Sequence, residues 1–452
     1  MSYYILPKTF NNIYLNLIHT SENSYKFILD SYLYKYSTII TQLKHTIDNL
    51  DPIICSIDEI VSKINPCQYI FTNIPRYNLK ISKLNSKDQM FYDLVEILYN
   101  FNLLDNNLNT SVKSLHIGSK STISIDFIQY YRKDCNFDTI CQMNTLTSNM
   151  FKPNFLNNIN FNLIIIDVTS FISSDNIIEE ILLYLALLFK HISLGGNCII
   201  NTDLYLSKNV IEFIYILTSM FEKTYVIKPN TCNVNSFEKY IICKNFKLNK
   251  ECYNVNYQLI KKYFENDIVY RKLQNINSLL DITTPCYFLN KIIEINTILG
   301  QNQIDIINNI INIINIINST KNCEKLNTLI RTNIQKSINW CIKFNVPYNS
   351  LDKKNIFLID VKYKINHYTN HNTSSITDEL NNNNGILNNE NECKEEYNDE
   401  YKDENEYKDE NEYKYENEYK DENEYKDDYN DDVNNIIYNT SIDDIIIESD
   451  FI

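Results

Sequence analysis

The sequence predicts an α/β protein whose centre is a mostly parallel β-sheet with helices on both faces. Three observations predict it. Between residues 113 and 246, short apolar runs alternate with segments of helical periodicity. The run FNLIIID, residues 161–167, is apolar almost throughout, which is typical of a strand buried on both faces of a parallel sheet. The neighbouring segments read as helical, and residues 351–452 have the composition of chain that does not pack.

The order of the elements follows from the spacing of apolar residues. We expect strands at residues 114–117, 137–142, 161–167, 197–201, 224–228 and 238–243, and helices at 25–50, 88–104, 124–131, 177–192 and 208–223. Gly195 and Gly196 follow the helix at 177–192, where glycine commonly ends a helix. In such sheets ligands bind at the carboxyl ends of the strands, where Gly118, Asp167 and Asn201 fall.

The chain is expected to divide into four regions. They are a helical region at residues 1–85, the sheet domain at 86–249, a second helical region at 250–350 and a low-complexity tail at 351–452. The second helical region carries an isoleucine stripe at Ile306, Ile310, Ile313 and Ile317. It also contains the only tryptophan, Trp340, which we expect to anchor the core.

The net charge of −15 comes from one segment. Residues 390–432 hold 21 acidic and 6 lysine side chains, so the rest of the chain is neutral. This segment repeats a hexapeptide close to YKDENE, and almost nothing in it can be buried, which predicts disorder. The tail is either a solvating expansion or a polyanionic arm for basic partners. The apolar motif at 445–447 is a candidate for strand addition to a partner.

Several classes of protein and site are disfavoured by the sequence. Residues 1–20 have polar breaks and no small-residue cleavage site, so we expect no signal peptide. The longest apolar run, residues 177–192, is too short and too charged to span a membrane. The twelve cysteines lack a Cys-x-x-Cys pair and predict free thiols, while His367 and His371 lie in a polar loop; we expect no metal site.

Residues 194–246 carry a set of recognisable features. A glycine pair precedes a strand, a helix and a strand ending in Lys-Pro follow, and the segment closes with SFEKYIIC, residues 236–243. Together these features resemble the carboxyl half of FtsJ-like RNA 2′-O-methyltransferases. The run NFNLIIIDVTS, residues 160–170, looks like the fourth strand of that family. The flanks LPKTF (6–10) and INWCIKFNVP (338–347) look like the form found in large cytoplasmic DNA viruses.

The resemblance implies a Rossmann-like methyltransferase that uses S-adenosylmethionine and methylates ribose 2′-hydroxyls through a Lys-Asp-Lys-Glu tetrad. Asp167 matches the aspartate of the tetrad and Glu238 its glutamate, whereas the two lysine positions fall on Asn201 and near Asp93. The cofactor loop, glycine-rich in the family, falls on residues that keep a single glycine: Gly118, Ser119, Lys120, Ser121 and Thr122, followed by Ile123.

These departures predict weak or absent catalysis. An asparagine amide cannot accept a proton, and losing a general base costs on the order of 10²–10⁴-fold in rate. Asp93, Asp167 and Glu238 are expected to face one another uncompensated, which would raise their pKa values. In the loop, β-branched Ile123 is expected to be strained in a conformation that glycine adopts, so cofactor binding is doubtful. Whether Lys113 or Lys120 replaces a missing lysine stays open.

Three functions therefore remain open. The first is a pseudoenzyme that serves as a structural partner of another methyltransferase or of a viral RNA-processing assembly. The second is an active RNA cap 2′-O-methyltransferase with a divergent site, acting in mRNA capping. The third is an interaction protein that uses its acidic tail. We expect an intracellular, cytoplasmic protein, in a viral factory or virion if viral. Because the chain outside the acidic segment is neutral, we expect weak RNA binding, through a local patch of Lys80, Lys83, Lys87 and Arg76.

Overall fold

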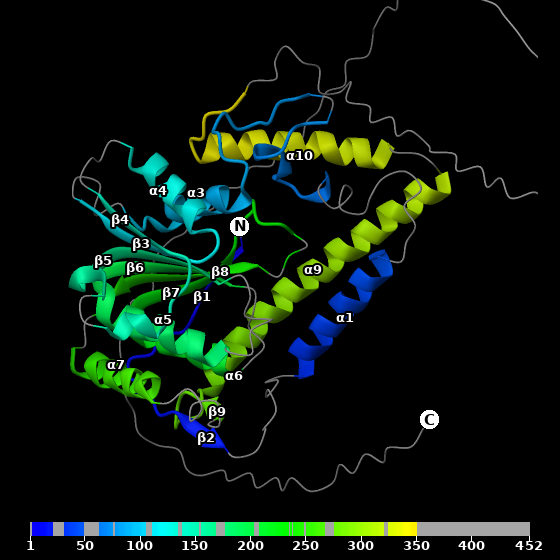
Figure 1. Cartoon of the computed structure of the whole chain (residues 1–452). Coiled ribbons are helices and arrows are strands. Elements are labelled where there is room, and N and C mark those ends of the chain that lie inside the picture. The colour runs from blue at the N-terminus through cyan, green and yellow to red at the C-terminus, as the bar shows by residue number, and fades with distance from the viewer. Residues whose placement is uncertain are drawn as a thin grey trace, which may run out of the picture. The chain divides into compact units, whose positions relative to one another are not determined.

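The computed structural model describes residues 2–20, 31–48, 63–75, 77–104, 111–133, 138–152, 155–168, 177–202, 208–234, 236, 238–247, 250–266, 275–320 and 324–349 (Figure 1). The chain divides into a unit at residues 1–371 and a second unit at 372–452. The acidic tail, the terminal apolar motif, His367 and His371 all lie outside the described residues.

A seven-stranded sheet forms the centre of the first unit (Figure 1). Its strands, in spatial order, are β1 (Ser2–Ile5), β7 (Phe221–Lys228), β8 (Lys239–Phe246), β6 (Ile192–Thr202), β5 (Phe161–Val168), β3 (Lys113–Ile117) and β4 (Thr139–Met143). Strands β4, β3, β5 and β6 are parallel, while β8 runs antiparallel between β6 and β7. The α/β fold expected from the sequence, Rossmann-like with a mostly parallel core, is confirmed.

Helices cover both faces of the sheet (Figure 1). One face carries α3 (Gln89–Phe101), α4 (Ser121–Tyr131) and α10 (Glu324–Lys343), and the other carries α5 (Ile177–His191), α6 (Lys208–Met220) and α7 (Lys250–Glu265). The long helix α9 (Cys286–Thr320) runs beside the sheet, and α1 (Ser31–Asp48) packs along α9.

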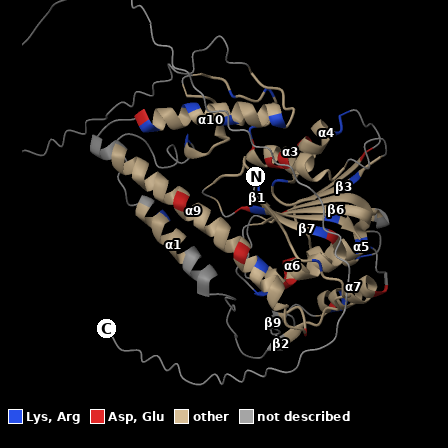
Figure 2. Ribbon diagram, turned by 180° about the vertical axis from the view of Figure 1, so that it is seen from behind, with Lys and Arg blue, Asp and Glu red and all other residues tan. Residues whose placement is uncertain are grey.

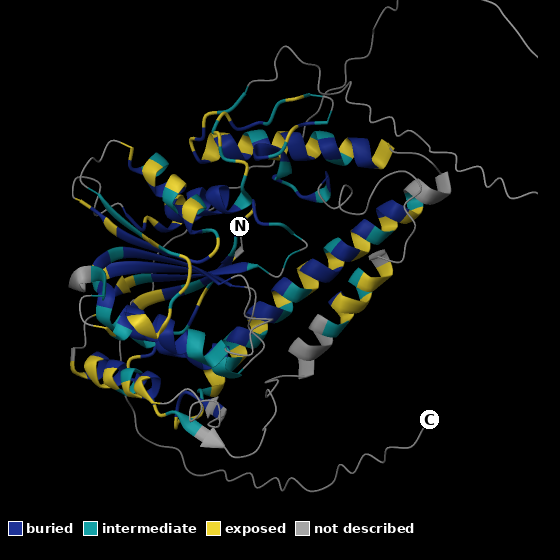
Figure 3. Cartoon of the chain, viewed as in Figure 1, coloured by how far each residue is buried: buried dark blue, intermediate teal, exposed yellow. Residues whose placement is uncertain are grey.

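The alternation of side chains along β5 explains why this strand is apolar throughout. Ile164 and Ile166 belong to the hydrophobic cluster shared with α5 and α6, whereas Leu163 and Ile165 belong to the cluster shared with α3, α9 and α10. Successive side chains of a strand point to opposite faces, so a strand covered on both faces needs apolar residues at every position. Figure 3 shows the sheet as a buried layer between helices whose outer faces are exposed.

The helix-ending role predicted for the glycine pair at residues 195 and 196 is wrong. Gly195 and Gly196 do not end a helix: α5 ends at His191, and β6 begins at once because Ile192 already pairs with Phe161. The glycines lie in the irregular stretch of that pairing, where Gly195 adopts a positive φ of 72°. A glycine pair next to a strand signals a bulge as readily as a helix end.

The flanking regions are also less purely helical than expected. The amino-terminal segment contributes β1 to the edge of the main sheet, next to β7. A short strand β2 (Ile18–Thr20) pairs with β9 (Asn275–Ser278), so both flanks contain strands. Strands this short carry little periodicity, and their partners lie far away in the sequence.

The described core positions that were expected in the second helical region are buried, except that Ile306 is half-buried against the core. Ile310 and Ile313 on α9 lie in the core, as predicted for the isoleucine stripe, while the side chain of Ile317 lies outside the described part. Trp340 is confirmed as a core residue: it is buried, and its indole Nε1 donates to Glu96 Oε2 at 2.8 Å.

The described ranges give three further findings. No helix in them combines the length and the apolar content needed to cross a bilayer. Within the same ranges, no His, Cys, Asp and Glu side chains gather as a set of three or more metal ligands. The eight cysteines that the structure describes are all free thiols.

Candidate active site

Four residues singled out in the sequence meet at the carboxyl end of the sheet. Asp167 on β5 and Asn201 on β6 are paired directly across the two strands. Tyr240 on β8 pairs with Asn201, which brings Glu238, immediately before β8, to the same edge. Asp93 comes from the helix α3 and joins the group through Glu238 and Tyr240. Residues distant in the sequence therefore form one polar cluster.

The amide of Asn201 links two carboxylates of this cluster. Its Nδ2 donates to Asp167 Oδ1 at 3.1 Å and to Glu238 Oε1 at 2.7 Å. Its Oδ1 is buried and has no hydrogen-bond partner among the described residues. The amide of Gln89 links a second pair of carboxylates in the same way: its Nε2 donates to Glu238 Oε2 at 3.3 Å and to Asp93 Oδ2 at 3.1 Å.

Asp93 is fully enclosed. Burial, together with the nearby carboxylate of Glu238, raises the pKa of Asp93 to about 8, against the hydrogen bonds that lower it. Those hydrogen bonds come from the hydroxyl of Thr231, the hydroxyl of Tyr240 at 3.0 Å and Gln89. A carboxyl group in this state carries a proton during much of its time at neutral pH and does not contact solvent.

Lys120 compensates part of the negative charge. Its Nζ lies 3.4 Å from Glu238 Oε1, and the two side chains are 34% and 20% exposed. Burial lowers the pKa of Lys120, but the carboxylates of Glu238, Asp167 and Asp88 together outweigh burial and leave that pKa above its ordinary value. The expectation that three carboxylates face one another uncompensated is therefore wrong: two amides and one ammonium separate them. Lys113 lies at the opposite end of β3.

The loop after β3 is built around Asp167. Gly118 has a φ of +115°, and a Cβ added there would lie 2.3 Å from the backbone oxygen of Asp167. The backbone N–H of Lys120 and the hydroxyl of Ser119 both donate to Asp167 Oδ2, each at 3.0 Å. The strain expected at Ile123 is wrong, because this residue already belongs to the first turn of α4.

The remaining loop positions contact the sheet. The backbone N–H of Ser121 donates to the carbonyl of Gly118 at 3.2 Å, and its hydroxyl accepts from Gln142 Nε2 at 3.0 Å. Thr122 lies exposed in the first turn of α4. The loop is thus tied together by its own hydrogen bonds.

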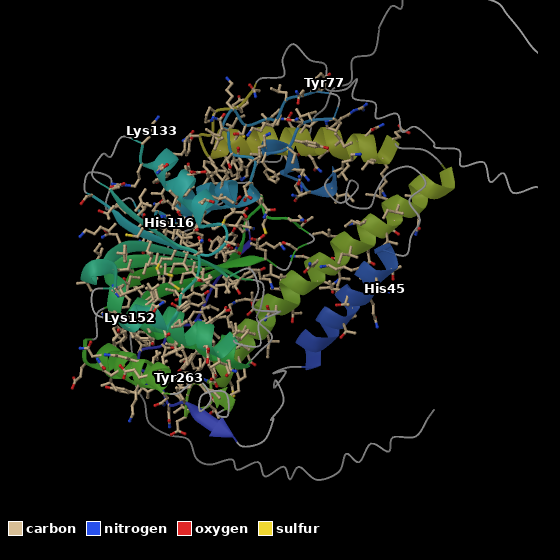
Figure 4. All side chains as sticks on the ribbon, in the orientation of Figure 1. His45, Tyr77, His116, Lys133, Lys152 and Tyr263 are labelled. Carbon is tan, nitrogen blue, oxygen red and sulfur yellow. The ribbon has the colours of Figure 1, made fainter. Side chains whose placement is uncertain are left out.

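His116 lies close to this loop but inside the domain, between β3 and α4 (Figure 4). Its two ring nitrogens lie 2.8 Å from the hydroxyl of Ser124 and 3.0 Å from that of Ser114. Burial lowers its pKa to about 3, so the ring is neutral at physiological pH. The neutral ring holds β3 against α4, which is a structural role.

The residues at these positions do not fit S-adenosylmethionine well. Donors that a cofactor carboxylate would need, the N–H of Lys120 and the hydroxyl of Ser119, already serve Asp167. Nucleotide sites of this fold also use a carboxylate after the second strand to hold the ribose. In the described residues 138–152 the one carboxylate is Asp138, and it lies at the start of β4, paired with Arg132.

Sequence reasoning missed three partners of the cluster. Gln89 lies one helical turn before Asp93, and its i, i+4 spacing was a usable signal. Thr231 and Tyr240 stood in segments already singled out, yet neither residue type at that spacing indicates a contact with α3. Of the lysine patch, Lys80 donates to the carbonyl of Ser86 at 2.6 Å, and Arg76 lies outside the described residues.

A comparison with protein families supports the resemblance. Residues 108–246 match the model of the family described as FtsJ-like methyltransferase, which generally uses S-adenosylmethionine. The match spans β3 to β8 and includes Asp167, Asn201 and Glu238, while Asp93 precedes it. No curated protein matches the chain.

Proposed function

Starting from the FtsJ-like methyltransferase domain at residues 108–246, we propose that the chain is a catalytically impaired RNA 2′-O-methyltransferase that acts as a structural or partner subunit. One observation carries the proposal: Asn201, at the position that the resemblance assigns to a catalytic lysine, lies between Asp167 and Glu238 and donates to both carboxylates. An amide donates hydrogen bonds to both carboxylates but cannot take the proton of a ribose hydroxyl.

Neither Lys120 nor Asp93 is placed to replace the missing base. Lys120 is ion-paired with Glu238, and its raised pKa keeps it protonated. Asp93 is buried beneath Gln89, Thr231 and Tyr240, away from any substrate hydroxyl. The loop donors committed to Asp167 further disfavour cofactor binding. The cluster thus supports a stable fold better than it supports methyl transfer.

The partner class follows from the resemblance to the viral form of the family. We propose another methyltransferase or an RNA-processing assembly, in the cytoplasm, as the partner. Retained cap methylation is the second candidate function. Lys120 favours it, since its ammonium lies 3.4 Å from Glu238 and could orient a ribose hydroxyl next to the unpartnered Asn201 Oδ1.

The test uses the full chain. We would titrate S-adenosylmethionine calorimetrically and then measure methyl transfer to capped RNA for the wild type, Asn201→Lys and the matched surface variant Asn100→Lys. The proposal expects no turnover by the wild type or Asn100→Lys. Turnover by the wild type that is lost in Lys120→Met would establish the second candidate instead. Any activity gained by Asn201→Lys would show that the missing base limits the reaction.

A further inference from the structure

A cavity lies next to the Asp167 cluster and is lined by other residues. It has a volume of about 720 Å³ and lies between the segment that follows β7 and one face each of α9 and α10. This volume is within the range of small-molecule sites, roughly 300–1,000 Å³. Its walls contain none of the four cluster positions, and α9 and α10 lie outside the matched residues 108–246. Figure 1 shows the two helices that flank it.

The cavity is positively charged. Lys228, Lys336 and Lys343 line it, against one carboxylate, Asp305. Lys336 and Lys343 are seven residues apart on α10, so two helical turns place them on the same face. Basic residues occur along this helix in Figure 2. No carboxylate among the described residues forms an ion pair with either lysine, and the Nζ of Lys343 lies 5.2 Å from the ring centroid of Phe344.

The third lysine is held in place at the base of the cavity. Lys228 donates to the carbonyl of Ser236, and burial lowers its pKa despite nearby acidic groups. A bound anion would offset this desolvation. Asp305 forms an ion pair with none of the three lysines, and its Oδ1 accepts a hydrogen bond from Gln301 Nε2 at 2.9 Å.

The other polar groups of the lining are amides. Asn230, Asn302 and Asn339 supply both donors and acceptors beside the apolar side chains of Trp340 and Phe344. Glu96, buried behind this wall, is satisfied by Trp340 Nε1 and by the backbone N–H of Asn230. Phosphate groups suit the lysines, and the edge of a base suits amides next to an apolar wall.

We propose that this cavity binds a phosphorylated nucleotide, with Lys336 and Lys343 contacting the phosphates. The phosphates belong either to a free nucleotide or to the phosphorylated 5′ end of an RNA. The site does not depend on cofactor binding at the Asp167 cluster. The segment after β7 contacts both the cavity and the Asp167 cluster. Thr231 in this segment donates to Asp93, and the Sγ of Cys232 lies 3.6 Å from the carbonyl of Glu238.

The experiment measures binding to the full chain at low and high salt. The probes are ATP, AMP, adenosine, inorganic pyrophosphate, and one short RNA with either a 5′-triphosphate or a 5′-hydroxyl. The variant Lys336→Gln/Lys343→Gln is compared with Lys325→Gln, an exposed lysine at the start of the same helix that does not line the cavity. Thermal melts confirm that each variant folds.

We expect ATP to bind more tightly than AMP and adenosine not to bind. The double variant should weaken ATP binding by about tenfold or more, because it removes two charge-assisted contacts to the phosphates, and Lys325→Gln should leave ATP binding unchanged. Binding of the triphosphorylated RNA with no binding of ATP would assign the phosphates to an RNA end. Absence of binding by every phosphorylated probe, or equal binding by the double variant, would overturn the proposal.

Discussion

The side chain of Asn201 holds Asp167 and Glu238 together, through hydrogen bonds of 3.1 Å and 2.7 Å from one amide nitrogen. Both acceptors are largely enclosed, so each bond satisfies a carboxylate that water reaches poorly. This relationship explains why an asparagine is compatible with a stable cluster in a place where catalysis would need a lysine.

Removing this amide should destabilise the fold. We predict that Asn201→Ala lowers the free energy of unfolding by about 2–3 kcal/mol, because hydrogen bonds to charged groups contribute about 1.5–3 kcal/mol. Urea unfolding measures the change. Asn100→Ala, on the exposed side of α3, should change it by less than about 0.5 kcal/mol. A loss no larger than that of the control would contradict the bridging role.

The two positive-φ glycines should respond differently to substitution. In Gly118→Ala the new Cβ would lie 2.3 Å from the carbonyl oxygen of Asp167, so β3 and β5 must separate. Gly195→Ala meets its nearest atom at 3.5 Å and suffers mainly from its φ of +72°. We predict a loss of more than about 3 kcal/mol for Gly118→Ala and about 1 kcal/mol for Gly195→Ala.

Chemical denaturation of the two variants side by side tests this prediction. Equal losses would show that β3 can shift at Gly118 without cost, and the close approach to Asp167 would then not constrain the loop.

The stability of the fold should fall as the pH rises, because of Asp93. Its pKa is raised to about 8 in the folded state from an ordinary value of 3.8, so its contribution is fully present below the lower value. As pH rises toward and through 8, the unfolded chain releases the proton more readily, and stability falls by up to about 1.4 kcal/mol per pH unit. In Asp93→Asn this part of the slope should disappear.

Melting temperatures of the wild type and Asp93→Asn between pH 5 and 9 measure the difference. Asp305→Asn, an exposed carboxylate of α9, serves as the control and should keep the wild-type slope. Parallel slopes for the wild type and Asp93→Asn would show that Asp93 is ionised in the folded protein throughout this range.

A buried ion pair next to β4 should be sensitive to loss of one partner. Arg132 Nε lies 2.5 Å from Asp138 Oδ2, with 2% and 8% of the side chains exposed. Arg132→Met leaves the Asp138 carboxylate buried with the backbone N–H of Val112 as a donor, and should cost about 3–5 kcal/mol.

The matched control removes one partner of an exposed pair. Lys291 and Glu294 are 3.0 Å apart on the surface of α9, and Lys291→Met should cost less than about 1 kcal/mol. Urea unfolding compares both variants. A cost for Arg132→Met as small as that of the control would mean that water enters and solvates Asp138.

Much of the sheet could be predicted because its parallel strands are short, continuous apolar runs. Asp167 and Asn201 each follow such a run, and neighbouring parallel strands end at the same edge, so their meeting is a direct consequence of the pattern. Glu238 could be placed only through the resemblance, since its strand β8 runs antiparallel between β6 and β7.

The contacts around the cluster could not be predicted in the same way. Lys120 reaches Glu238 from the loop between β3 and α4, and its side chain has several rotamers of similar energy. Gly195 looked like a helix end because glycine favours positive φ in helix ends and in bulges alike. Whether a helix end or a bulge is formed depends on strand pairing, which is a tertiary effect.

The position of β1 bears on how the chain folds. Of the seven strands of this sheet, β1 comes earliest along the chain, yet residues 2–5 pair with residues 225–228 of β7, far later in the chain. During synthesis β1 must therefore wait for nearly the whole domain before its backbone is paired, which slows folding. Until then β7 presents an open edge to other nascent chains. Deletion of residues 2–5 would thus favour aggregation at that edge, even in a chain whose polar cluster is intact.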